Sequence, residues 1–127
     1  MAALALAGAE AQATTVTMTG VVHTVCEASF TMEPVAIDAR RYDLGQLKRS
    51  CNDGAGYRIV IHTPAGLSGA VLVLGTKQIA LSDNGTTVVV DSDTDGRAVE
   101  PARIVLTAPA AQPLTVRLET IAKGPIY

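Results

Sequence analysis

Short runs of β-branched residues, separated by turn residues every eight to twelve positions or so, make up the sequence from residue 14 onward. The turns contain glycine, proline, asparagine and aspartate, as in Asn84-Gly85 and Asp95-Gly96. No segment has the periodicity of an amphipathic helix. The spacing therefore predicts an all-β sandwich. The expected strands cover residues 15–25, 28–32, 35–38, 57–63, 69–74, 77–81, 86–91, 103–107 and 114–121.

Two of these strands alternate between apolar and polar side chains, which predicts one buried face and one solvent-facing face. The alternation places Tyr57, Ile59 and Ile61 opposite Arg58 and His62, and Leu114, Val116 and Leu118 opposite Thr115, Arg117 and Glu119. The runs 70–74 and 88–90 are apolar on both faces. We expect those two strands to lie centrally or to be covered by something outside the chain.

The chain has 127 residues, which is room for one domain. Its residues are 48% hydrophobic and 17% charged, enough apolar surface for a core. A net charge of −2 and a 3% share of aromatic residues argue against a nucleic-acid partner. Such a partner is usually bound by a basic surface and by aromatic side chains that stack on bases.

The first thirteen residues are rich in alanine and leucine and end in Ala11-Gln12-Ala13, a small-x-small pattern typical of signal-peptidase sites. We interpret residues 1–13 as the remnant of a cleaved signal peptide, and residues 14–127 as one exported domain with an N-terminal extension at 14–25. A disordered alanine-rich tail is the alternative. No later stretch is long and apolar enough to predict a membrane span.

Export predicts that the two cysteines form a disulfide, since small exported domains commonly carry one. A bond between Cys26 and Cys51 would close a loop of about 25 residues and contribute roughly 3 kcal/mol to stability. Two buried free thiols are the alternative.

The catalytic inventory is thin, and we predict neither an enzyme nor a bound cofactor. His23 and His62 lie in expected strands without metal-ligand spacing, and Ser68 lacks the second glycine of a nucleophile elbow. A secreted hydrolase whose Ser, His and Asp come from distant positions is kept as a rival. Asp91, Asp93 and Asp95 precede a glycine with the spacing of a calcium loop, but Ala102 stands where a bidentate acid belongs. A solvated acidic hairpin loop is the other interpretation.

The segment 14–25 alternates threonine with small or apolar residues and leads directly into Cys26. Its apolar face consists of Val16, Met18, Gly20 and Val22. Such a strand can pair within its own domain or enter a groove on a neighbouring chain.

Four segments together resemble the subunits of archaic chaperone–usher fimbriae, the spore coat protein U-like family. They are the stretch running into Cys26, the segment Tyr42-Asp43-Leu44-Gly45-Gln46-Leu47, the turn and strand that follow Cys51, and the C-terminal strand 114–121 with terminal Tyr127.

The resemblance implies an immunoglobulin-like, pilin-type sandwich that is incomplete because its last strand is missing. It implies that Val16, Met18, Gly20 and Val22 are donated to a neighbouring subunit, and that the cysteines join the first two strands. The implied partners are further subunits, a periplasmic chaperone and an outer-membrane usher, and the implied location is the cell surface. A self-contained secreted binding module, stabilised by calcium, is the alternative function.

Overall fold

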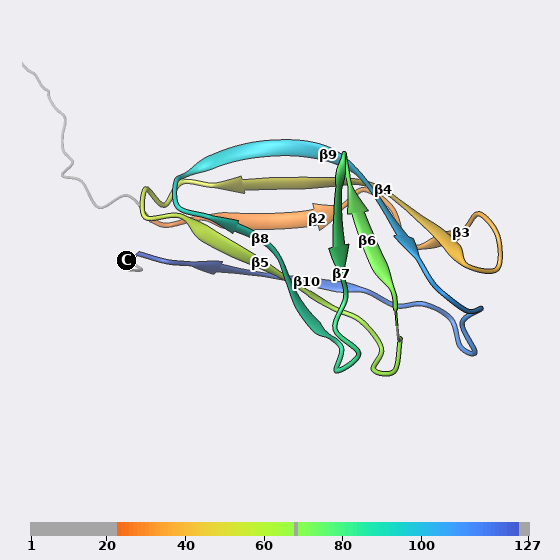
Figure 1. Ribbon diagram of the computed structural model, residues 1–127. Coiled ribbons are helices and arrows are strands. Elements are labelled where there is room, and N and C mark those ends of the chain that lie inside the picture. Colours follow the sequence, from red (N-terminus) through yellow and green to blue (C-terminus); the bar gives the residue numbers. More distant parts are fainter. Residues whose placement is uncertain (1–22, 68, 125–127) are drawn as a thin grey trace, which may run out of the picture.

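The computed structural model describes residues 23–67 and 69–124 (Figure 1). These residues form strands joined by turns and loops, and none of them is helical. The strands are β2 (Cys26–Phe30), β3 (Val35–Ala36), β4 (Arg41–Cys51), β5 (Tyr57–His62), β6 (Val71–Leu74), β7 (Lys77–Ala80), β8 (Thr86–Ser92), β9 (Gly96–Val105) and β10 (Arg117–Ala122).

The strands form two antiparallel sheets, which confirms the expected all-β sandwich (Figure 1). The larger sheet has the order β2-β4-β9-β6-β7, with β3 paired to β4, and the smaller has the order β10-β5-β8. The neighbours β2, β4, β9 and β6 follow the order of strands A, B, E and D in an immunoglobulin domain, and β5 and β10 match C and F. The chain order of these six strands agrees with the same assignment.

The core lies between the two sheets and is mostly aliphatic, as the shortage of aromatic residues predicts. The alternation expected for β5 is confirmed, because Tyr57, Ile59 and Ile61 are buried and Arg58 is exposed. The largest fully buried side chains come from both sheets: Leu44, Leu47, Ile59, Ile61, Leu72, Leu74 and Ile104.

The longest strand, β4, is absent from the expected strands. Its residues Lys48, Arg49 and Ser50 are polar, and the register with β9 shifts between Asp43 and Gln46, which breaks the alternation. The strand forms because it lies between β2 and β9 and buries Leu44, Leu47 and Cys51. Residues 96–102 of β9 were missed for a similar reason, since they include Glu100 and Pro101.

Three other expectations have different outcomes. The strand expected at 15–25 lies outside the described residues except for 23–25, which belong to no strand. β10 begins at Arg117 rather than at residue 114, although Leu114 is still buried. Of the two runs that are apolar on both faces, β6 lies between β9 and β7 as expected, whereas β8 is an edge strand with Val88 48% exposed.

Candidate functional site: an apolar groove between β2 and β10

The free edge of β10 is the feature that sets this sandwich apart from a closed one. β10 pairs with β5 on one side, and no strand among the described residues pairs with its other side. In an immunoglobulin domain strand G occupies that position beside strand F. The backbone groups along this edge are therefore available to a strand from elsewhere.

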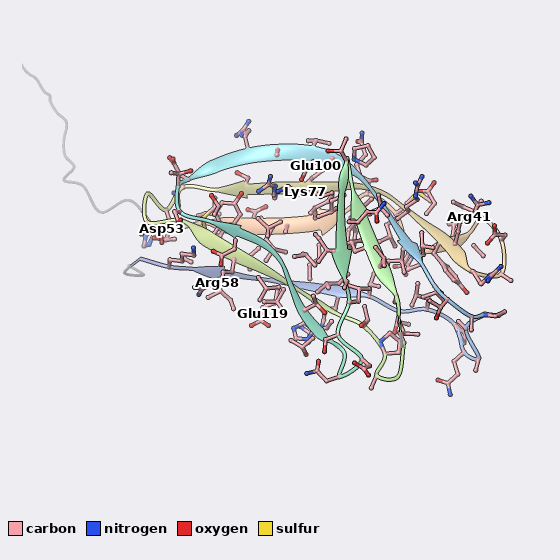
Figure 2. The ribbon with its side chains drawn as sticks, in the orientation of Figure 1. Arg41, Asp53, Arg58, Lys77, Glu100 and Glu119 are labelled. Atoms are coloured by element: carbon pink, nitrogen blue, oxygen red, sulfur yellow. A yellow bond between two sulfur atoms is a disulfide. The ribbon has the colours of Figure 1, made fainter. Side chains whose placement is uncertain are left out.

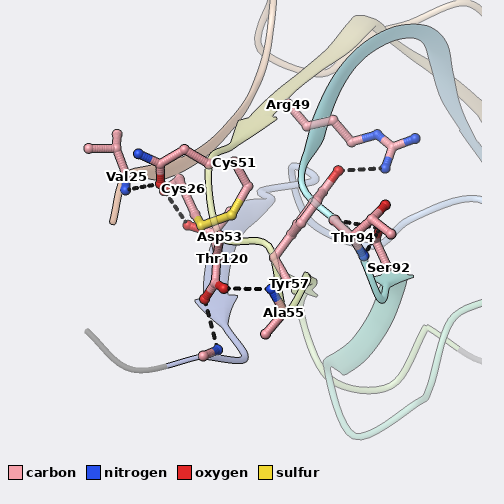
Figure 3. Close-up of a disulfide and its surroundings, with 12 residues drawn as sticks. Val25, Cys26, Arg49, Cys51, Asp53, Ala55, Tyr57, Ser92, Thr94 and Thr120 are labelled. Carbon is pink, nitrogen blue, oxygen red and sulfur yellow. Dashed lines mark hydrogen bonds between the residues drawn. A yellow bond between two sulfur atoms is a disulfide. The ribbon is translucent and has the colours of Figure 1, made fainter. Parts of the chain in front are cut away.

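The edge strand β2 of the larger sheet lies across the sandwich from β10. The two strands meet at one end, where the Thr120 hydroxyl donates a hydrogen bond to the carbonyl oxygen of Cys26 over 2.8 Å (Figure 3). Elsewhere they leave a groove of about 430 Å³ between them. The groove is lined by Ala28, Ser29 and Phe30 of β2, by Val116 and Leu118 from the β10 side, and by the turn at residues 31–34.

Four apolar side chains of the groove lining are only partly covered. Ala28, Phe30, Val116 and Leu118 are half-buried and pack against the core, while the side chains between them face solvent. A strand inserted here would cover them with its own alternate side chains, at a gain of about 25 cal/mol for each Å² of apolar surface removed from water.

A second hollow of about 410 Å³ continues the same line of inward side chains beyond the start of β10. Its lining includes Leu114, Leu106, Leu67 and Ala110. Leu114 is the next inward position before Val116, which lines the first groove. The apolar face along residues 114–118 thus borders both hollows.

The disulfide fixes β2 as one wall of the groove (Figure 3). Cys26 and Cys51 are bonded and are direct partners in the β2–β4 pair, so the expected disulfide is confirmed. Asn52 strengthens this end, since its Oδ1 accepts from the Val25 amide at 2.8 Å and its Nδ2 donates to the His23 carbonyl at 2.9 Å.

The other end of β2 is tied to the bulge in β4. The Thr31 amide donates to the Gln46 carbonyl, and the Gln46 amide donates to Thr31 Oγ1, both over 2.9 Å. Gly45 has a φ of 74°, and Thr31 and Met32 occupy the space that a Cβ would need. β2 is therefore attached to β4 at both ends without help from β10.

The C-terminal end of β10 is anchored by Asp53, a buried carboxylate in the turn after Cys51. Its two oxygens accept from the amides of Ala55 and Gly124, each at 2.8 Å. The Lys123 amide donates to the Gly56 carbonyl at 3.0 Å. The turn that follows the second cysteine thus holds the end of the strand whose edge is free.

Lys123 connects the same end to the acidic loop between β8 and β9. Its ammonium bonds to Asp91 and, at 2.8 Å, to Asp93. The hydrogen bond from Lys123 holds the pKa of Asp91 below its ordinary value, with Arg58 adding to the effect, and the bonds to Asp91 and Asp93 raise the pKa of Lys123.

These contacts concern the carboxylates of the alternative calcium site, Asp91, Asp93 and Asp95. Asp91 and Asp93 already have a cation partner in Lys123, and Asp95 makes no contact that would bring it to the other two. Across residues 23–67 and 69–124 no three His, Cys, Asp or Glu side chains converge as metal ligands would.

The remaining residues singled out in the sequence do not gather at the groove. Val16, Met18, Gly20, Val22 and Ser68 lie outside the described residues. His62 lies on the outer face of the smaller sheet, where its Nε2 is 2.9 Å from Glu119 Oε1. His23 precedes β2 and is exposed.

The sequence indicated one wall of the groove and missed the other. The alternation at 114–118 was recognised, but Ala28 and Phe30 were taken only as part of a strand. Their exposure to a groove follows from the opposition of β2 and β10 across two sheets, which no local pattern encodes.

Nothing in the described part of the chain forms a helix that could span a lipid bilayer. Comparisons with protein-family models, with curated proteins and with solved structures find no match to this chain.

Proposed function

We propose that this domain is a non-enzymatic structural subunit of a bacterial surface fibre or coat, exported and assembled by strand donation between copies. The observation that carries the proposal is the free edge of β10 beside an apolar groove. A domain that had to stand alone would gain by covering such an edge, since an open edge with apolar neighbours invites association.

The physical basis is β-strand addition. A donated strand would form backbone hydrogen bonds along β10, and its alternate side chains would cover Ala28, Phe30, Val116 and Leu118. The backbone supplies affinity for any strand, while the spacing of the apolar side chains fixes the register.

The donor in this proposal is the segment 14–25 of another copy, whose apolar face is Val16, Met18, Gly20 and Val22. The family resemblance adds a periplasmic chaperone that would cover the groove before assembly, and an outer-membrane usher. Both partners belong to the proposal.

The test uses the full chain and a synthetic peptide that copies residues 14–25. We expect the chain to form oligomers in analytical ultracentrifugation, or else to gain thermal stability when the peptide is added. Leu118→Glu should abolish both effects because it places a charge in the groove. Ile121→Glu is the matched control, since Ile121 lies on the same strand but is 41% exposed on the outer face.

A charge at position 118 can also unfold the domain. Leu118→Ala is therefore tested as well, and a circular dichroism spectrum of each variant shows whether it is folded. A wild-type chain that stays monomeric and ignores the peptide would contradict the proposal. That result would favour the alternative of a self-contained secreted binding module.

A further inference from the structure

The outer face of the larger sheet carries a trough of about 460 Å³ that the proposed assembly does not use. It crosses β2, β4 and β9 near their disulfide end, where the residues of the three strands are in register. Two rows of outward side chains form its walls. One row is Glu27, Ser50 and Arg97, and the other is Ser29, Lys48 and Val99.

The row between these walls faces the opposite direction. Ala28, Arg49 and Ala98 are direct partners across the strands, and all three are half-buried. The Arg49 guanidinium bonds to Tyr57 Oη at 2.8 Å (Figure 3) and lies 3.5 Å from Glu100 Oε1. The floor of the trough is therefore mostly backbone, and its depth comes from the walls.

Two cations of the trough lack an ion partner among the described residues. Lys48 and Arg97 are exposed and form no ion pair there, whereas Arg41, Arg58 and Lys123 each pair with an aspartate. Lys48 lies opposite Val99, so Arg97 is its diagonal neighbour, at a typical separation of roughly 7–8 Å. Two like charges at this distance favour an anionic group between them.

The other walls give the expected ligand further features. Ser29 and Ser50 offer hydroxyls, and Glu27 can accept a hydrogen bond from a ligand hydroxyl. Val99 is 55% exposed and presents an apolar surface at the edge. An anionic group, several hydroxyls and one apolar face are together the chemistry of a carboxylated sugar.

We propose that this trough binds a carboxylated sugar residue, with the carboxylate between Lys48 and Arg97 and the ring hydroxyls toward Glu27, Ser29 and Ser50. The volume suits one or two sugar residues, since small-molecule sites typically measure about 300–1,000 Å³. β4, the central strand of the trough, is hydrogen-bonded on both sides and cannot accept a donated strand. The inference does not depend on strand donation, since neither Lys48 nor Arg97 lines the groove.

The test is saturation-transfer difference NMR on the full chain, which detects the ligand and tolerates any state of assembly. The probes are glucuronate and, as the uncharged counterpart, glucose. We expect a signal for glucuronate that weakens with added salt, and a much weaker one for glucose. Lys48→Gln and Arg97→Gln should each lower the affinity for glucuronate about tenfold, because each removes a charge-assisted hydrogen bond.

Lys77→Gln is the matched control, since Lys77 is exposed on the edge strand β7 of the same sheet and does not line the trough (Figure 2). Its affinity should equal that of the wild type. The proposal is overturned if glucuronate gives no signal, if glucose binds equally well, or if Lys48→Gln and Arg97→Gln bind glucuronate like the wild type.

Discussion

Asp53 combines two tasks that are usually separate in a β-sandwich turn. It is 8% exposed, and it holds both its own turn, through Ala55, and the end of β10, through Gly124 (Figure 3). A carboxylate serves here because it offers two acceptor oxygens in fixed directions. The segment after Cys51 is thus important for the position of β10 as well as for the disulfide.

Asp53→Ala should lower the free energy of unfolding by about 1–3 kcal/mol, since it leaves two partly buried amides without an acceptor. Urea denaturation followed by circular dichroism measures the change. Asp83→Ala is the control, because Asp83 is exposed and only its backbone carbonyl forms a hydrogen bond, to the Gly66 amide. Equal stability of the two variants would show that the Asp53 contacts contribute nothing.

The Lys123 cluster should give folding a specific pH dependence. The lowered pKa of Asp91 stabilises the fold above its ordinary value of 3.8, and this contribution is lost as the pH falls below that value. The raised pKa of Lys123 stabilises the fold below 10.5, and this contribution is lost as the pH rises above it.

Lys123→Met should therefore destabilise the domain most between these two pH values, and the difference from the wild type should shrink at both ends. Chemical denaturation at a series of pH values tests this, with Lys77→Met as the control. A difference that stays constant across the whole range would exclude an electrostatic role for Lys123.

The junction of β2 and β4 shows why the sequence predicted some elements and not others. β5 places apolar side chains at every second position, Tyr57, Ile59 and Ile61, so its buried face was evident. β4 carries a bulge at Gly45 and turns Arg49 inward, where Tyr57 and Glu100 receive it. An inward arginine is stable here because Tyr57 of β5 and Glu100 of β9 contact it. The sequence of β4 alone does not predict these contacts.

Gly45→Ala should destabilise the domain by more than the roughly 1–2 kcal/mol that a left-handed conformation alone costs. The excess arises because the new Cβ would meet Thr31 and Met32. Gly66→Ala isolates the conformational cost, as Gly66 has a φ of 88° and open space around it, and Gly54→Ala should be nearly neutral. Thermal or urea unfolding of the three variants should rank them in this order.

At the level of the whole molecule, the spacing of strands and turns in the sequence predicted the class of fold. The inference of export predicted the disulfide. The groove did not follow, because it depends on which strands become the edges of the two sheets. Ala28 and Val116 are far apart in the sequence, and they line one groove only because β2 and β10 end their respective sheets on the same side.

The two edges of the smaller sheet are not equivalent. The register of β8 with β5 shifts between Ile59 and Val60, which leaves Val89 as an extra residue, whereas β10 pairs with β5 without a shift. A bulge twists an edge and discourages further pairing there. Within the smaller sheet, strand addition is then confined to the β10 side, so each copy in the assembly we propose accepts one donor strand in this sheet.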